Sequence, residues 1–310
     1  MNDAFKSEFW QLSREQIGYY AWATRDRWRF SQMMHRHCHR CPCCDDPEPR
    51  ALVDDMIEHG AGLHPVLDPL FEAFVRAEAR LLLRFIPQRS HEERLTGNLV
   101  SEIDAAMNLA RPCYEQACKA RYGETKDVDF LYLDISRGGR IEKKTGGDLA
   151  FIFSIELPDL PPLVRFAVFQ AKKLDGSCAL DKRQYQTLRD KFGEAAAYLF
   201  YDMDLQDTRP PMVRSAESLE DLAKKTEPTS SFTISRDRVD EGLPLSFWLF
   251  AELRAGRAGT AADSFRQALQ TVTEELHTLD SDLNFRVAVL TVGRALRVTR
   301  DRESGLRVTI

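Results

Sequence analysis

The polar residues with the clearest chemical potential lie in two short segments separated by an apolar stretch. TGGDLAFIF contains Asp148, and VFQAKK contains Gln170 and Lys172. Gln170 and Lys172 are two residues apart, so on a strand both side chains project from one face. A carboxylate and an amide oxygen can bind Mg²⁺, and a lysine can orient water or offset negative charge in a transition state. If the fold brings them together, these residues suit metal-dependent cleavage of a phosphodiester bond.

Three apolar runs rich in Phe, Val and Ile surround these residues. DVDFLYLDIS, GDLAFIFSIEL and VRFAVFQAK predict three consecutive strands. The PDLPP turn predicts a hairpin between the last two strands, because proline removes donors from a strand interior. If these strands cover about 148–156 and 164–172, the hairpin sets Asp148 opposite Lys172 and diagonal to Gln170.

Helices are predicted on either side of these strands. SHEERLTGNLVSEIDAAMNLA has helical periodicity, and Ser90 and Glu93 have the spacing of a capping box. DKRQYQTLRDKFGEA predicts a second helix that ends near Gly193, and AAAYLFYDM predicts a fourth strand. The order of helix, three strands, helix and strand indicates an α/β protein.

These segments together resemble the PD-(D/E)XK nuclease superfamily, which includes many restriction endonucleases and Holliday-junction resolving enzymes. The sequence looks most like the branch in which glutamine replaces the acid of the D/E-x-K element, here Gln170-Ala171-Lys172. The resemblance covers about residues 90–202. ERLTGN, KKTGGDLAF, VFQAKKL, DKRQYQTL and AYLFYD are also similar to an uncharacterised bacterial nuclease-like family. The resemblance implies a restriction-endonuclease-like core of helix, three-stranded meander, helix and strand.

The resemblance also implies roles for individual residues. Asp148 would be the metal-binding acid, Gln170 would occupy the variant metal position, and Lys172 would be the catalytic lysine. The metal would be Mg²⁺ or Mn²⁺, and the substrate DNA rather than RNA. The resemblance also implies a role in restriction or in defence against phage, because many nucleases of this superfamily act there.

Further site residues are expected from the two helices. The superfamily often adds a glutamate from the helix before the strands, and the match is Glu93 in ERLTGN, with Glu92 and Glu102 as alternatives. Gln184 or Gln186, on the helix after the lysine strand, is expected to face the site.

Basic residues follow the same segment. Between Arg165 and Lys191 there are seven basic residues and three acidic ones, which could hold a nucleic-acid backbone. We expect contacts from Lys173, Lys182, Arg183 and Gln184. The tail adds Arg286, Arg294, Arg297, Arg300, Arg302 and Arg307. These arginines form either a basic stripe or an ordinary protected sheet edge.

A cluster of histidines and cysteines lies near the N-terminus. Cys38, Cys41, Cys43 and Cys44 fall within seven residues, which is too tight for an ordinary disulfide framework. The step from Cys38 to Cys41 matches half of a zinc knuckle. A structural zinc and an exposed thiol-rich loop both remain open, because no second ligand pair is evident; Cys113 and Cys118 are candidates by count alone.

Length and composition restrict the remaining choices. The 310 residues, 43% hydrophobic and 29% charged, are typical of a soluble globular protein. The net charge of −5 excludes a globally basic, histone-like protein, and no apolar run is long enough to span a bilayer. We expect a cytoplasmic protein with a helical region over 1–87, a nuclease core over 88–250 and a C-terminal extension over 251–310. Residues 206–242 are expected to form a long loop with little regular structure.

Two alternatives to a nuclease remain at this point. One is a catalytically silent module on the same fold that binds nucleic acid or regulates a partner, since Gln170 keeps an oxygen but removes a charge. The other is a zinc-dependent interaction protein in which residues 1–90 carry the function.

Overall fold

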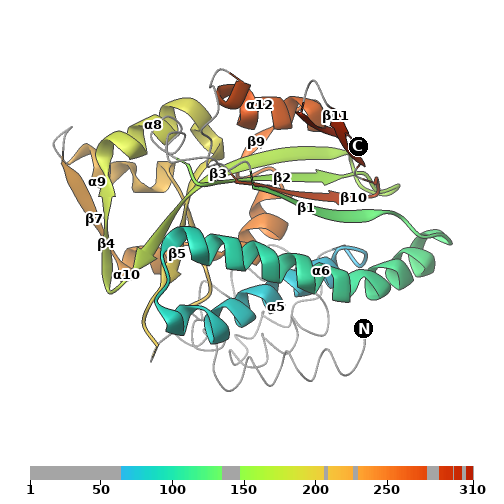
Figure 1. Ribbon diagram of the computed structural model, residues 1–310, viewed down its shortest axis with the longest axis horizontal. Coiled ribbons are helices and arrows are strands. Elements are labelled where there is room, and N and C mark those ends of the chain that lie inside the picture. The colour runs from blue at the N-terminus through green and yellow to red at the C-terminus, as the bar shows by residue number, and fades with distance from the viewer. Residues whose placement is uncertain are drawn as a thin grey trace, which may run out of the picture.

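The computed structural model describes residues 64–134, 147–205, 209–225, 230–277, 286–295, 297–301 and 305–309. These residues form three layers, with helices on both faces of one mixed sheet (Figure 1). The α/β class and the helical segment before the strands are therefore confirmed.

The sheet has the strand order β1-β10-β2-β3-β5-β6-β8, and β9 pairs with β3. The strands are β1 (Val128–Asp134), β10 (Arg286–Val292), β2 (Leu149–Ile155), β3 (Leu163–Leu174), β5 (Ala196–Asp202), β6 (Met212–Ser215), β8 (Leu243–Pro244) and β9 (Thr260–Ala261). The β10–β2 and β3–β5 pairs are parallel, and the other pairs are antiparallel. Two small sheets pair β4 (Ser177–Asp181) with β7 (Ser231–Ser235) and β11 (Arg297–Asp301) with β12 (Gly305–Thr309).

The long helices lie on opposite faces of this sheet (Figure 1). Helices α5 (Asp68–Arg84) and α6 (Glu92–Tyr122) pack against each other on one face, and α8 (Lys182–Phe192) and α12 (Phe265–His277) lie on the other. Shorter helical segments are η3 (Ile86–Gln88), η4 (Gly193–Ala195), η5 (Glu217–Leu219), α9 (Glu220–Lys224), α10 (Arg236–Asp240), α11 (Leu245–Phe247) and the π-helix η6 (Trp248–Leu253).

One hydrophobic core joins elements from distant parts of the described chain. Phe74 of α5 packs its ring edge-on against Phe151 of β2 and against Phe250 of η6, with ring centroids 5.9 and 5.3 Å apart. Such aromatic contacts add to the free energy gained by burying the rings. The expected boundaries at residues 88 and 250 therefore lie within a continuous core.

The expected three-stranded meander is wrong in one respect. Each of β1, β2 and β3 forms close to its predicted position, but β10 lies between β1 and β2. β10 is completely apolar from Val287 to Leu290 and is buried on both faces, which suits a central strand. The pairing of β10 is non-local, so adjacency in sequence could not predict it.

Helix α6 differs from the prediction at both ends. It begins at Glu92 with His91 as N-cap and no capping side chain, so the expected Ser90–Glu93 capping box does not form. It then continues through Pro112 to Tyr122. Its buried stripe extends past the proline to Tyr114 and Cys118, and this packing outweighs the lost backbone bond.

The expected long loop over 206–242 is also wrong. Its described residues include β6, η5, α9, β7 and α10. In β7, buried Phe232 and Ile234 alternate with exposed polar residues, so the strand has one buried and one solvated face. Its polar composition therefore indicated a loop although the segment forms a strand.

Candidate functional site

The β2–β3 hairpin brings Asp148 and Gln170 into direct contact. Leu149 pairs with Phe169, and this register extended by one residue sets Asp148 opposite Gln170, not opposite Lys172 as expected. Gln170 Nε2 donates to Asp148 Oδ2 at 2.6 Å, and the Ala171 N–H donates to the same oxygen at 2.8 Å. The prediction of proximity holds, with the register corrected by two positions.

Lys172 lies two residues after Gln170, on the face of the sheet that α8 covers. Its Nζ lies 3.5 Å from Oε1 of Gln184, one of the two glutamines on α8 that were expected to face the site. Asp181 caps α8 by accepting from the Gln184 N–H at 2.9 Å, which fixes the first turn of the helix beside Lys172. Gln186, the alternative, is exposed and lines a pocket on another side of α8.

Of the three acidic candidates on α6, the structure brings Glu92 to the lysine strand. Glu92 Oε1 accepts from the Lys173 N–H at 3.2 Å. Glu93, the residue expected there, is exposed and contributes its backbone carbonyl to Arg286. Glu102 is buried between Arg80 and Arg84, where it has a structural role.

Charges from both faces of the sheet reach Cys178 on β4, a residue that the sequence analysis did not single out. Burial raises the pKa of the Cys178 thiol to about 12; the charge of Lys172 opposes this rise, and that of Glu92 adds to it. Glu92 and Lys172 therefore lie near the same thiol, although they come from opposite sides of β3.

Tyr201 of β5 was also missed. Its hydroxyl forms a buried 3.0 Å hydrogen bond with Thr96 of α6. Burial raises the pKa of Tyr201 and the bond to Thr96 lowers it; the charge of Asp148 raises it and that of Arg286 lowers it. Asp148 and Arg286 are thus both close to this tyrosine. The ERLTGN and AYLFYD segments contained both hydrogen-bonding residues, but only the fold brings them together.

Beside Asp148 lies one buried oxygen to which no described residue donates a hydrogen bond. Gln170 is 1% exposed, and no described residue donates a hydrogen bond to its Oε1. A buried amide oxygen without a donor is costly unless a ligand or an ordered water satisfies it. Among the described residues, no group of three His, Cys, Asp or Glu side chains could hold a metal ion. A cation at Asp148 would therefore depend on the amide oxygen, water and substrate oxygens, which Mg²⁺ accepts.

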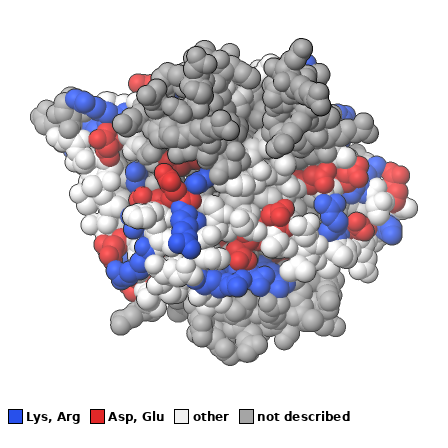
Figure 2. Space-filling view, viewed as in Figure 1, with Lys and Arg blue, Asp and Glu red and all other residues white. Residues whose placement is uncertain are grey.

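The basic residues do not gather into one surface. Arg165 donates to the Ala258 and Gly259 carbonyls, and Arg189 pairs with Glu220 at 2.7 Å. Lys182 is 8% exposed, while Arg183 is exposed. On the face in Figure 2, Lys and Arg side chains are interspersed with Asp and Glu over the described residues.

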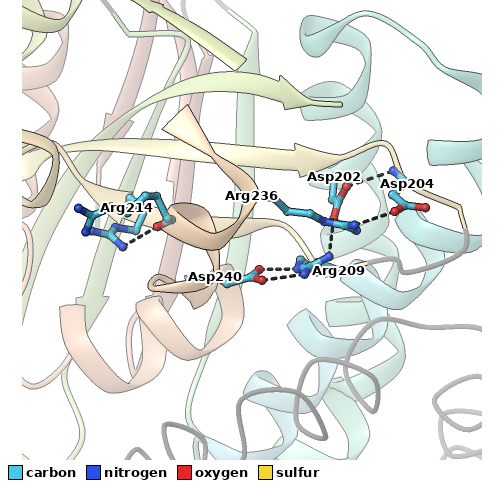
Figure 3. A network of polar contacts seen from close by, with 7 residues as sticks. Asp202, Asp204, Arg209, Arg214, Arg236 and Asp240 are labelled. Carbon is cyan, nitrogen blue, oxygen red and sulfur yellow. Dashed lines mark hydrogen bonds and ion pairs between the residues drawn. The ribbon is translucent and has the colours of Figure 1, made fainter. Parts of the chain in front are cut away.

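A network of three aspartates and two arginines joins the end of β5 to α10, close to the end of β3 (Figure 3). The Asp202 carboxylate, 2% exposed, accepts from Arg209 at 3.1 Å and from Arg236 at 2.5 Å. Arg236 also bonds Asp204, and Arg209 binds Asp240 with two nitrogens. Planar bidentate pairs of this kind restrict orientation strongly. The network attaches the segment after β5 to α10.

The cysteine cluster that was a candidate zinc site precedes His64, the first described residue. Cys38, Cys41, Cys43 and Cys44 lie outside the described residues. Among the described helices, none combines the length and apolar composition that crossing a bilayer requires. No family model matches the chain, and searches of curated proteins and of solved structures found no match.

Proposed function

We propose that this chain is a metal-dependent nuclease that hydrolyses phosphodiester bonds, with DNA as its substrate class. The observation that carries the proposal is the contact of Asp148 with Gln170, which lies two residues before Lys172 on β3. The resemblance of Gln170-Ala171-Lys172 to the glutamine branch of the PD-(D/E)XK superfamily supports it. A role in defence against phage is a further expectation from that resemblance.

Asp148 and the Gln170 amide oxygen are the groups that would hold Mg²⁺ or Mn²⁺. When bound, such a metal would polarise a phosphate oxygen and lower the pKa of a water molecule. Asp148 supplies the negative charge, and its Oδ2 is oriented by the Ala171 N–H. Because glutamine is neutral, Gln170 contributes an oxygen without further repulsion of the phosphate.

Lys172 and Glu92 contribute opposite charges beside this pair. The Lys172 ammonium, held at Gln184, can donate to a phosphate oxygen on which negative charge develops. Glu92 has one oxygen engaged by the Lys173 N–H, and no described residue bonds its second oxygen. That oxygen can accept a hydrogen bond from an attacking water.

Cleavage of supercoiled plasmid and of single-stranded DNA with Mg²⁺ or Mn²⁺ tests the proposal. Asp148→Asn and Lys172→Met preserve side-chain size, and we expect each to reduce the cleavage rate about 100-fold or more. Lys119→Met, an exposed change near the other end of α6, should leave the rate unchanged. Circular dichroism and thermal unfolding check that each variant folds. Cleavage that survives both site variants, or a folded wild type that does not cleave, contradicts the proposal.

One observation favours a catalytically silent binding module instead. Asp148 Oδ2 already accepts two hydrogen bonds, so the carboxylate has a structural role in the hairpin. A silent module predicts DNA binding that is independent of Mg²⁺, with no cleavage by wild type. Titration of a labelled duplex with and without Mg²⁺ distinguishes the two functions.

A further inference from the structure

The strand that joins the sheet from the C-terminal part of the chain begins beside the candidate site. β10 runs parallel to β2, and Arg286, its first residue, pairs with Leu149, the residue after Asp148. β2 in turn pairs with β3, which carries Gln170 and Lys172. Three adjacent strands therefore bring Arg286, Asp148 and the Gln170–Lys172 pair to one end of the sheet, with Arg286 on the α6 face and Lys172 on the α8 face.

The first turn of α6 extends over this end of the sheet and is attached to it twice. Arg286 donates through one terminal nitrogen to the Glu93 carbonyl at 2.8 Å, and Glu92 accepts from the Lys173 N–H. These two contacts attach α6 to β10 and to β3. β2, which begins immediately after Asp148, lies between those two strands. Tyr201, which responds to the charges of both Asp148 and Arg286, lies beneath the same turn through its bond to Thr96.

The described contact of the Arg286 side chain uses one of its nitrogens. A guanidinium has five N–H donors, and the one described contact uses a neutral carbonyl. Arg286 is paired with Asp134 of β1 in the strand register. Among the side chains that the structure describes, no carboxylate lies within ion-pair distance of Arg286, whereas Arg294 pairs with Glu156 and Arg209 with Asp202. The Arg286 residue is half-buried, so the orientation of its side chain is restricted while solvent can still reach it.

We propose that Arg286 binds a backbone phosphate of the nucleic acid at this site and so positions the scissile bond beside Asp148. The proposal rests on the proposed function for its substrate class. The planar fork of arginine suits two oxygens of one phosphate, and the carbonyl of Glu93 holds the fork in place. Arg286 is thus a substrate-positioning residue from a segment outside the stretch that resembles the nuclease superfamily.

Fluorescence anisotropy with a short fluorescein-labelled DNA duplex tests this assignment, with Ca²⁺ in place of Mg²⁺ and gel analysis to confirm that the duplex stays intact. We expect Arg286→Gln to weaken binding about tenfold or more and to reduce the salt dependence of the affinity by about one phosphate contact. Arg286→Lys should restore part of the affinity, since it keeps the charge and loses the fork. Arg266→Gln removes the same charge from an exposed site on α12 and should bind as wild type does.

Two measurements separate this inference from the proposed function. Weaker binding by Arg286→Gln, with no cleavage by wild type under Mg²⁺, would retain Arg286 as a phosphate ligand and overturn the nuclease proposal. Unchanged affinity and salt dependence in a folded Arg286→Gln variant would overturn the inference, even if wild type cleaves DNA. Absence of DNA binding by wild type would also overturn it.

Discussion

Glu78 on α5 is a fully buried carboxyl group whose titration should make stability depend on pH. Its two oxygens accept from the Ser246 N–H and from the Ser246 hydroxyl, each at 2.8 Å. Burial raises the pKa of Glu78 from 4.5 to about 8, and the two hydrogen bonds from Ser246 oppose this rise. Glu78→Gln would keep an acceptor for the Ser246 N–H and a donor for its hydroxyl, without a titrating proton.

The sign of the effect follows from the two pKa values. The pKa of Glu78 is higher in the folded protein than in the unfolded chain, so the folded protein holds this proton more tightly. The stabilisation from the bound proton is complete below pH 4.5 and is lost as the pH rises toward 8. Each pH unit in that window lowers the free energy of unfolding by about 1.4 kcal/mol through this group. The loss is about 3 kcal/mol at pH 7 and about 5 kcal/mol above pH 8.

Urea unfolding of wild type and Glu78→Gln at several pH values between 5 and 8 measures this contribution. The difference in unfolding free energy between Glu78→Gln and wild type should grow in favour of the variant, by about 4 kcal/mol over that range. Glu217→Gln, an exposed change, should give a pH profile parallel to wild type. Parallel profiles for wild type and Glu78→Gln would refute the reasoning, because the carboxyl group would then titrate alike in the folded and unfolded states.

Two stability predictions concern other parts of the fold. Arg209→Met removes one partner from buried Asp202 and from partly buried Asp240, and it should lower the unfolding free energy by about 3 kcal/mol. Arg238→Met, a change at an exposed ion pair, should lower it by less than about 1 kcal/mol in the same urea titration. Gly293 has φ +95°, and a Cβ there would lie 1.8 Å from the Glu156 carbonyl oxygen, so Gly293→Ala should destabilise by more than about 1 kcal/mol, while Gly97→Ala, in open space on α6, should not destabilise in thermal unfolding. Equal effects within either pair would contradict the corresponding assignment.

Local sequence patterns predicted the elements that carry the hairpin. β2, β3, β5 and α8 lie within a few residues of their expected positions, because continuous apolar runs and the Gly193 stop are strong local signals. The same patterns placed Asp148, Gln170 and Lys172 on neighbouring strands. They could not fix the register, since a change of two positions keeps every side chain on its face.

The choice among acidic residues on α6 required the fold. Glu92, Glu93 and Glu102 occur on one helix, and the resemblance of ERLTGN to the superfamily favoured Glu93. The helix begins at Glu92, and its rotation relative to β3 turns Glu92 to the Lys173 N–H and Glu93 to solvent. The rotation of α6 about its axis is set by the packing of α5 and the sheet against its buried stripe. The positions of the glutamates in the sequence do not reveal that rotation.

The position of β10 changes how the C-terminal segment relates to function. In sequence, residues 251–310 follow the candidate nuclease core as an extension, and the arginines of the tail suggest only a stripe or a protected edge. In the fold, β10 is hydrogen-bonded to β1 and β2 and contributes Val287, Ala288, Val289 and Leu290 to the core, each 0% exposed. Deleting it would remove a central strand, so a truncated chain would lose activity through unfolding whether or not Arg286 binds phosphate. Single substitutions at Arg286, which leave the apolar residues of β10 in place, are therefore the changes that can separate a role in binding from a role in the fold.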